Sequence, residues 1–276
     1  MPASLPVVVP SYLAKVHRAK KHLIDLKDEI NRYAATKPYT VSERIEGKKE
    51  REVRRLTFTA DPANTDIPII AADVIYNLRS SLDHLMSSLV SCKDRGSAMF
   101  PVFFQGVWEP PLPGENEQRG RDRSRWTSYT KSVHPEALAF LKSAQPPDDA
   151  GDGEEAHLIR FLNRLSNRDR HEKLPVLVTG LRHLTVSWET PNGLRQTGLV
   201  PHSQTSFFED EARLDLPYDA MNVEIEGSPL IVIRVRQDVH TRDRHLAVLP
   251  ELNRTVNLLE EWVIPALSPY DRTVSR

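Results

Sequence analysis

The sequence predicts an α+β fold, because the spacing of its apolar residues changes part-way along the chain. Before Pro175, apolar residues recur at helical spacing in several long segments. After Pro175, short runs alternate between apolar and polar residues and are separated by turn signals. Helices followed by strands are typical of α+β proteins. We therefore expect one domain over residues 1–276, with a helical portion over 11–175 and an antiparallel sheet over 180–236.

The N-terminal part of the chain is expected to form a helix, a hairpin and a second helix. Ser11 is a suitable N-cap for an amphipathic helix that runs to about Ala35. A polar β-hairpin over residues 38–60 follows, with Gly47 at its turn. The next helix is expected from about Ile67 to Lys93, and it carries the residues of greatest functional interest.

The middle of the chain is expected to contain a long loop and two more helices. The segment from Val107 to Arg125 is rich in Pro, Gly and charge without periodicity, which predicts a surface loop or a partly disordered segment. Helices are expected from about Ser124 to Ala144 and from about Glu154 to Asn167. The sequence QPPDDAGDG between them is a strong helix breaker.

The remaining elements are strands and a final helix. The runs LTVSWET and LRQTGLV flank the turn at Asn192-Gly193, the run ARLDL follows, and the runs NVEIE and LIVIRVR flank Gly227-Ser228. The alternation predicts an antiparallel sheet of roughly five strands. A C-terminal helix is expected over residues 243–264, with Asp243 as its cap and Pro265 as its end.

The composition limits the class of protein. The chain has 37 Lys and Arg against 38 Asp and Glu, a formal net charge of -1, so binding to nucleic acid would need a local basic patch. Its single cysteine, Cys92, excludes an intrachain disulfide framework and is typical of a reducing compartment. Neither a signal peptide nor an apolar run of ~20 residues is recognisable. We expect a cytoplasmic protein with no membrane partner.

The expected helix that contains YNLRSSLDHL, residues 76–85, has an unusual polar face. On a helical wheel its apolar stripe falls within one arc of about 100°. The opposite side carries Asp73, Asn77, Ser80, His84 and Ser87, and between the two sides lie Tyr76, Arg79 and Asp83. The polar face includes no Lys or Glu, which a solvated face normally prefers. Arg79 and Asp83 are four residues apart and able to pair. This composition favours a surface that packs against a partner or lines a cleft, although a structural hydrogen-bond network explains it equally.

A second polar cluster lies in LSNRDRHEKLP, residues 165–175. Asn167, Asp169 and His171 alternate along it, with Arg170 between the last two. In a functional site, Asp169 and His171 would point at the face that bears Asn77 and His84. Asn and Asp also cap helix ends, so a structural role stays open.

Arg79 and His84 have the spacing of a known motif. The segment resembles the R-x(4-6)-H signature of HEPN domains, the helical bundles of the higher eukaryotes and prokaryotes nucleotide-binding superfamily. The resemblance implies a HEPN-like helical bundle. Ser80 departs from the usual ribonuclease form, in which a polar residue such as Asn, Asp or His often follows the Arg.

A wider set of elements, covering roughly residues 11–175, resembles a group of uncharacterised bacterial proteins. The matching elements are Asp73, Asn77-Leu78-Arg79-Ser80, Leu82-Asp83-His84, Phe100-Pro101 and Asn167-x-Asp169-x-His171. This second resemblance brings no established activity with it.

The HEPN resemblance implies a function, because many members are metal-independent endoribonucleases of toxin-antitoxin and phage-defence systems. In such an enzyme His84 would move protons, since the ordinary pKa of histidine is ~6.5. Arg79 would stabilise the charged phosphate. The wheel places the two about 140° apart, so Arg79 must bend round or a second protomer must contribute. Superfamily members commonly dimerise across this helix, and we expect a homodimer that binds RNA.

The candidate residues follow from these two clusters. The candidate catalytic residues are Arg79, His84, Asn77, Asp83 and His171, and the candidate substrate-binding residues are Tyr76, Asp73, Asn167, Asp169 and Arg170. A basic run beside Trp126 either holds RNA or forms a solvated loop; it consists of Arg119, Arg121, Arg123 and Arg125.

Two other functions stay open, and no cofactor is expected. Some members of the superfamily are non-catalytic, so the chain also fits a module that binds a nucleotide or a protein. A metal-dependent enzyme could use ligands of a kind that suits Mn, Fe or Zn, namely Asp73, His84, Asp169 and His171. No HExxH or paired ExxH spacing supports a metal site, and GxGxxG, P-loop and GxSxG motifs are absent from the sequence.

Overall fold

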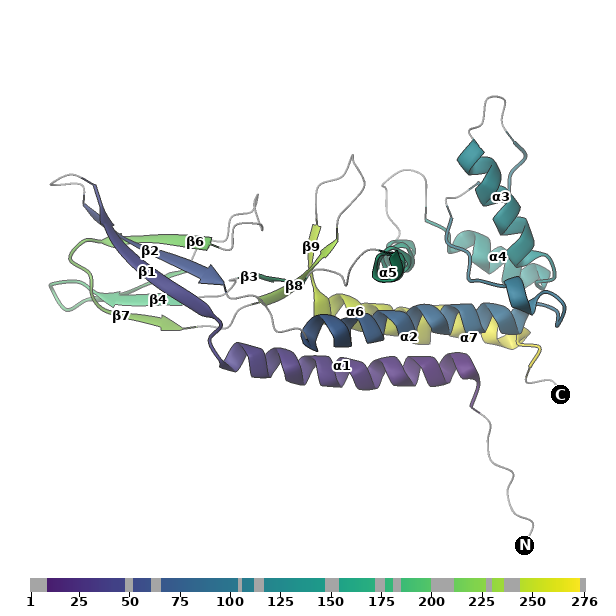
Figure 1. The fold of residues 1–276 in the computed structure, drawn as a ribbon, viewed down its shortest axis with the longest axis horizontal. Coiled ribbons are helices and arrows are strands. Elements are labelled where there is room, and N and C mark those ends of the chain that lie inside the picture. The colour runs from purple at the N-terminus through teal and green to yellow at the C-terminus, as the bar shows by residue number, and fades with distance from the viewer. Residues whose placement is uncertain are drawn as a thin grey trace, which may run out of the picture. The chain divides into compact units, whose positions relative to one another are not determined.

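The structure is a computed structural model of the 276-residue chain (Figure 1). It describes residues 9–47, 52–60, 66–103, 106–111, 117–146, 154–171, 177–180, 185–199, 211–226, 230–235 and 244–273. For some of these only the backbone is described: 60, 154–157, 168–171, 177–180, 211–212, 230–235 and 244–246.

The chain is α+β, as predicted. The helices are α1 (Ser11–Ala35), α2 (Asp66–Leu89), α3 (Glu117–Thr130), α4 (Pro135–Ser143), α5 (Glu154–His171), α6 (Val248–Leu258) and α7 (Ile264–Leu267). The strands are β1 (Tyr39–Glu46), β2 (Val53–Ala60), β3 (Leu177–Gly180), β4 (Thr185–Glu189), β5 (Arg195–Leu199), β6 (Glu211–Pro217), β7 (Met221–Glu226), β8 (Leu230–Val235) and β9 (Arg244–Ala247). Among the described helices, none is both long enough and apolar enough to cross a membrane.

The chain divides into two compact units, and each is built from separate stretches of sequence. Unit 1 consists of Met1–Ile24, Ala71–Lys173 and Pro250–Arg276, and unit 2 of Asp25–Ile70 and Leu174–Leu249. The boundaries fall inside α1 and α2, so both helices begin in one unit and end in the other. The expected organisation, one domain with a helical portion over 11–175, stays a prediction.

Unit 1 is built around the apolar faces of its helices. The stripe predicted for the second helix is buried along its whole length, with each side chain at most 1% exposed; its members are Ile75, Leu78, Leu82, Leu85, Met86 and Leu89. α1 runs alongside α2 (Figure 1), and the Ser81 hydroxyl donates to the Tyr12 carbonyl at 2.9 Å. Helices α5 and α6 add buried residues such as Leu162 and Leu252.

A helix occupies part of the segment that was predicted as a loop. α3 begins at Glu117, and it is separate from α4, so the prediction of one helix from Ser124 to Ala144 is wrong. Polar side-chain pairs support α3, including one between Gln118 and Asp122 at 2.9 Å. A helix that is supported by polar pairs shows no apolar periodicity. The spacing of apolar residues therefore did not indicate α3.

Pro135 accounts for the break between α3 and α4. A proline disfavours helical backbone in the residue before it, and His134 is extended, with φ −58° and ψ 140°. The His134 ring accepts a hydrogen bond from the Glu136 N–H at 3.3 Å and so caps α4. Proline suits the first turn of a helix, where its missing N–H has no partner to lose.

The C-terminal helix begins later and ends differently from the prediction. Residues Arg244–Ala247 form β9 and α6 begins at Val248. The expected cap, Asp243, lies outside the described residues. The helix also does not stop at Pro265, because a π-helical turn, η3 (Leu259–Val263), leads into α7. The Ile264 N–H bonds to the Leu259 carbonyl five residues back. Pro265 then lies in the first turn of α7, where a proline is tolerated.

Unit 2 contains three antiparallel three-stranded sheets, ordered β1-β2-β6, β3-β8-β9 and β5-β4-β7. The N-terminal hairpin is confirmed, and so is the β4–β5 hairpin at Asn192-Gly193, where Gly193 has φ +74°. The expected hairpin across Gly227-Ser228 is wrong, because β7 pairs with β4 while β8 pairs with β3 and β9. Alternation identifies strands, but it does not select their partners.

Two of these sheets pack face to face around a small apolar core. Its buried members come from β2, β4, β6 and the residue before β7, and they are Leu56, Phe58, Val186, Leu216 and Ala220. Phe58 is fully buried and contacts Tyr39, with ring centroids 6.4 Å apart. The inner face of β2 therefore holds the hairpin of β1 and β2 to the β5-β4-β7 sheet.

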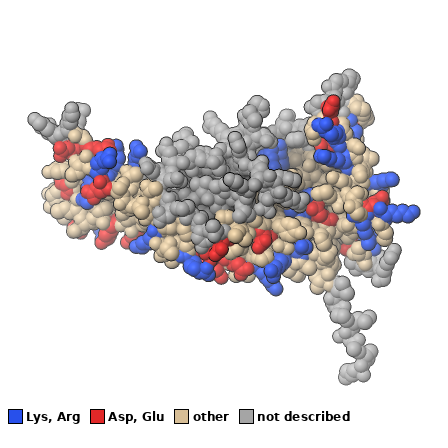
Figure 2. Space-filling view, in the orientation of Figure 1, with Lys and Arg blue, Asp and Glu red and all other residues tan. Residues whose placement is uncertain are grey.

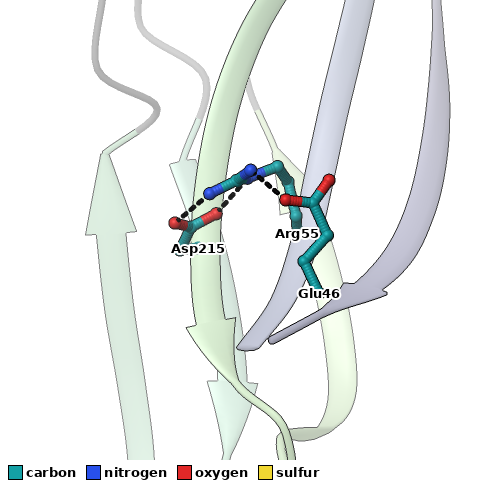
Figure 3. A network of polar contacts seen from close by, with 3 residues as sticks. All are labelled: Glu46, Arg55 and Asp215. Carbon is teal, nitrogen blue, oxygen red and sulfur yellow. Dashed lines mark hydrogen bonds and ion pairs between the residues drawn. The ribbon is translucent and has the colours of Figure 1, made fainter. Parts of the chain in front are cut away.

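The opposite face of β2 carries a charged network (Figure 3). The Arg55 guanidinium bonds both carboxylate oxygens of Asp215, at 2.7 and 2.8 Å, and also contacts Glu46. Register explains the arrangement, because Arg55 lies directly opposite Asp215 across the β2–β6 pair. The guanidinium lowers the pKa of the Asp215 carboxyl. The network links the three strands of this sheet at an exposed surface, where ion pairs contribute little to stability.

The unit 2 core gives the first testable prediction. Phe58→Ala is expected to lower the free energy of unfolding by about 3–5 kcal/mol, because it leaves a cavity between two sheets. Val41→Ala is the control, since Val41 lies opposite Phe58 in the β1–β2 pair and is 38% exposed; its loss should stay below about 1 kcal/mol. Chemical denaturation measures both, and equal losses would contradict a core centred on Phe58.

Candidate functional site

Arg79 and Asp83 hold the segment that follows α2 against that helix. The Arg79 Nη2 atom lies 3.0 Å from the Asp83 Oδ1 atom and donates to the Phe100 carbonyl at 3.0 Å. The same Asp83 oxygen accepts the Phe100 N–H at 3.0 Å. Two side chains one helical turn apart thus bind both backbone groups of one residue, an arrangement that we call the Phe100 clasp. Arg79 is only 4% exposed, so the clasp lies in the interior of unit 1.

His84 lies next to the clasp in sequence but lines a pocket. The pocket is partly open and has a volume of about 340 Å³. All of its lining residues belong to unit 1, and they include Ser11, Asp83, His84, Ser87, Arg95 and Thr273. Of the candidate catalytic residues, the structure brings Asp83 and His84 to this pocket and places Arg79 in the core.

Ser11, the first residue of α1, orients the His84 ring. The His84 Nδ1 atom lies 2.9 Å from the Ser11 hydroxyl oxygen. If the hydroxyl donates, a neutral ring carries its proton on Nε2; if Nδ1 donates, Nε2 is an acceptor. In both cases one ring nitrogen is held by Ser11 and the ring is fixed relative to the pocket.

Arg95 brings a cation to the same pocket. It begins the 3₁₀ turn η2 (Arg95–Ser97), and the Ser87 hydroxyl donates to its carbonyl oxygen at 3.5 Å. The Arg95 Nε atom is buried, and no residue in the described part of the chain accepts a hydrogen bond from it. A buried donor of this kind favours an added acceptor. The pocket therefore combines an imidazole, a guanidinium and several hydroxyl groups.

The C-terminal segment supplies another wall of the pocket. The Arg272 N–H donates to the Ser88 carbonyl at 3.0 Å, and the Arg272 side chain donates to the Ser132 carbonyl at 2.8 Å. Asp271 accepts from both the N–H and the hydroxyl of Thr273, at 2.7 and 2.6 Å. Burial, together with the charge of Asp271 and a hydrogen bond to it, raises the pKa of Tyr12 to about 12.

The other candidate residues do not all gather at this pocket. Asn77 is buried, and its side-chain amide donates to the Asp73 carbonyl of its own helix at 2.8 Å. Asp73 and Asn167 are exposed. Tyr76 is half exposed, and the Lys15 ammonium lies 5.2 Å from its ring centroid.

Part of the second polar cluster lies outside the described residues. The side chains of Asp169, Arg170 and His171 lie outside the described residues, although their backbone continues α5. The predicted cleft that joins Asn77, His84, Asp169 and His171 therefore stays a prediction. Within the described part of the chain, no group of three or more His, Cys, Asp or Glu side chains could hold a metal.

The basic run expected to hold RNA lies on α3, and its aromatic neighbour is not free to stack on bases. Trp126 is 4% exposed and contacts Trp108, with ring centroids 5.2 Å apart. The Arg123 Nε atom donates to the Glu109 carbonyl at 2.8 Å. Arg121 pairs with Glu117 at 3.5 Å. The run is thus partly engaged in holding α3 and the preceding segment.

Comparison with protein-family models, with curated proteins and with solved structures finds no match. Several residues line the pocket that the sequence did not indicate, namely Tyr12, Ser88, Arg95, Ala98 and Thr273. Arg95 lies just beyond the expected helix, and Thr273 is far from it along the chain, so no local spacing pointed to either.

The Phe100 clasp gives the second prediction. Arg79→Met keeps the apolar stem but leaves Asp83 and the Phe100 carbonyl without their cation, and it should lower the free energy of unfolding by about 3 kcal/mol. The control is Arg121→Met on α3, where the Arg121 side chain is 59% exposed, and its loss should stay below about 1 kcal/mol. Urea denaturation measures both changes. Similar losses in the two variants would show that the clasp contributes no more than a surface pair.

Tyr12 gives a prediction about pH. A pKa of about 12 in the folded state, against 10.0 for the ordinary group, means that the native chain keeps a proton that the unfolded chain loses first. The resulting stabilisation is complete below pH 10 and is lost as the pH rises through 12. The urea midpoint of the wild type should therefore fall more steeply from pH 10 to 12 than that of Tyr12→Phe. Tyr218→Phe, at an exposed site, should keep the wild-type slope; a wild-type slope in Tyr12→Phe would be the contrary result.

Proposed function

We propose that the chain is a metal-independent endoribonuclease whose reaction takes place at the pocket beside His84. The observation that carries the proposal is the placement of the His84 imidazole, oriented by Ser11, in a pocket that also contains the Arg95 guanidinium. An imidazole transfers protons near neutral pH. A guanidinium stabilises the charge that develops on a phosphate. The resemblance to HEPN domains supports the same reaction.

The reaction proposed is attack by a ribose 2′-hydroxyl on the adjacent phosphorus. His84 accepts the hydroxyl proton as the bond between O2′ and phosphorus forms. The bond from phosphorus to the 5′ oxygen breaks, and the leaving oxygen takes up the proton from the imidazolium. The products are a 2′,3′-cyclic phosphate and a 5′-hydroxyl end. No metal takes part in these steps.

The proposal differs from the sequence interpretation in the origin of the cation. Arg79 is engaged in the Phe100 clasp, whereas Arg95 lines the pocket of the same chain. A second protomer is therefore not required to bring a cation to His84. The homodimer, the cytoplasmic location and a role in a toxin-antitoxin or defence system stay predictions of the resemblance.

A second candidate function is a non-catalytic module that binds a phosphate-bearing ligand. It is favoured by the use of Arg79, the arginine of the HEPN-like motif, as a structural residue. Such a module would use the hydroxyl groups and Arg95 for binding and would need no proton transfer at His84.

Cleavage of labelled RNA in EDTA tests the proposed activity. The wild type should cleave RNA and spare the same sequence made of DNA, because the nucleophile is the 2′-hydroxyl. His84→Ala should reduce the rate by about 100-fold or more, and the product should carry a cyclic phosphate. His17→Ala, which removes an exposed imidazole from α1, should cleave at the wild-type rate.

Three results would contradict the endoribonuclease. RNA left intact by the folded wild type favours the binding module. A His84→Ala variant that cleaves as fast as the wild type removes the proposed proton carrier. Activity that appears only after a divalent metal is added favours the metal-dependent alternative.

A further inference from the structure

We propose that Arg95, and not Arg79, is the phosphate-binding residue of this protein, and that a basic rim beside the pocket holds the next phosphate of a single-stranded RNA. The inference rests on the proposed function for the identity of the RNA, but the binding can be measured without cleavage. The rim consists of Lys93, Lys131 and Arg272, all of which are exposed.

The two carboxylates that flank this region are already engaged by other groups. Asp83 is held in the Phe100 clasp by Arg79 and by the Phe100 N–H. Hydrogen bonds from Ser91 and Ser132, with the charges of Lys131 and Lys93, keep the pKa of the Asp94 carboxyl below its ordinary value. Both carboxylates therefore have partners other than Arg95, which leaves the guanidinium to bind an anion from outside the chain.

Arg95 is a lining residue of the pocket. Its Nε atom is buried and has no acceptor in the described part of the chain. Phosphate oxygens suit a guanidinium at this position, because it makes short, charge-assisted hydrogen bonds to them. Ser11, Ser87 and Thr273 line the same pocket and offer hydroxyl donors for the remaining phosphate oxygens.

The rim is tied to the pocket by hydrogen bonds. Arg272 bonds to the carbonyls of Ser88 and Ser132, and Ser88 is a pocket residue. Ser132 also accepts the Ser91 N–H through its hydroxyl, at 2.9 Å. Lys93 and Lys131 act on Asp94, the residue before Arg95.

The rim gives this region a local excess of positive charge. The chain as a whole has a net charge of -1, yet the rim and Arg95 together supply four cations. The carboxylates nearby are those of Asp94, of Asp271 and of Asp83, and Asp83 is already paired with Arg79. Lys and Arg side chains are also prominent where α3 and α4 lie (Figure 2). A basic surface that continues from a phosphate pocket is suited to a chain of phosphates more than to a single small anion.

Binding to a non-cleavable RNA tests the inference. A fluorescent single-stranded RNA with 2′-O-methyl groups would be titrated with the full chain, and inorganic phosphate would be added as a competitor. Arg95→Gln should weaken RNA binding by at least tenfold and abolish competition by phosphate. Arg95→Lys should recover only part of the affinity, because lysine restores the positive charge but lacks the planar guanidinium and its paired N–H donors. Arg195→Gln, which removes an exposed cation from β5 in unit 2, should bind like the wild type.

Two further measurements separate binding from folding. Arg95→Gln should keep the wild-type melting temperature, since it removes a buried donor that has no acceptor within the described residues. Lys131→Gln should reduce the slope of log K against log salt by about 0.7, the value for one phosphate contact in a single strand. A lower melting temperature with unchanged RNA affinity in Arg95→Gln would make Arg95 a structural residue and overturn the inference.

The outcomes distinguish this inference from the proposed function. If the wild type binds the modified RNA through Arg95 but leaves unmodified RNA intact, the phosphate site stands and the endoribonuclease fails. If the wild type cleaves RNA through His84 and Arg95→Gln binds RNA as tightly as the wild type, the endoribonuclease activity stands and the inference fails. Binding of inorganic phosphate with no measurable binding of RNA would overturn the basic rim.

Discussion

The Phe100 clasp fixes the position of the segment after α2, and both the core and the pocket of unit 1 depend on it. A buried guanidinium is tolerated only while its carboxylate and carbonyl partners stay in place. Arg79 therefore binds the helix to Phe100, a side chain that is itself 1% exposed. Asp83 belongs to the clasp and also lines the pocket. A change in the packing of Phe100 would consequently shift the Asp83 carboxylate, and with it one wall of the pocket.

The R-x4-H spacing joins two residues that the structure uses for different purposes. Five residues along a helix correspond to a rotation of about 140°, and the sequence alone already set Arg79 and His84 on different sides. The sequence could not say whether Arg79, at the border of the apolar stripe, would be buried or exposed, because an arginine is found at either location when it has partners. The contact with Phe100 decides it for Arg79, and the contact with Ser11 orients His84.

Periodicity predicted those parts of the fold in which burial follows a helical face. The helix from Ser11 to Ala35 and the buried stripe of α2 agree with the sequence interpretation. α3 was missed because its polar side-chain pairs carry no apolar signal, and the partners of β7 were mistaken because strand pairing depends on distant segments. The candidate site was predicted in part, at Asp83 and His84. Arg95 and Thr273 reach the pocket only through tertiary packing, which local spacing does not encode.

The interleaving of the two units has a consequence for synthesis on the ribosome. Unit 1 takes one of its segments from residues 250–276, and the two stretches of unit 2 lie between the three segments of unit 1. Unit 1 cannot complete its packing while the nascent chain still lacks Asp271 and Arg272, which contact Tyr12 and Ser88. The pocket can therefore be completed only after this segment has been synthesised. A nascent chain that stops short of these residues lacks one wall of the pocket.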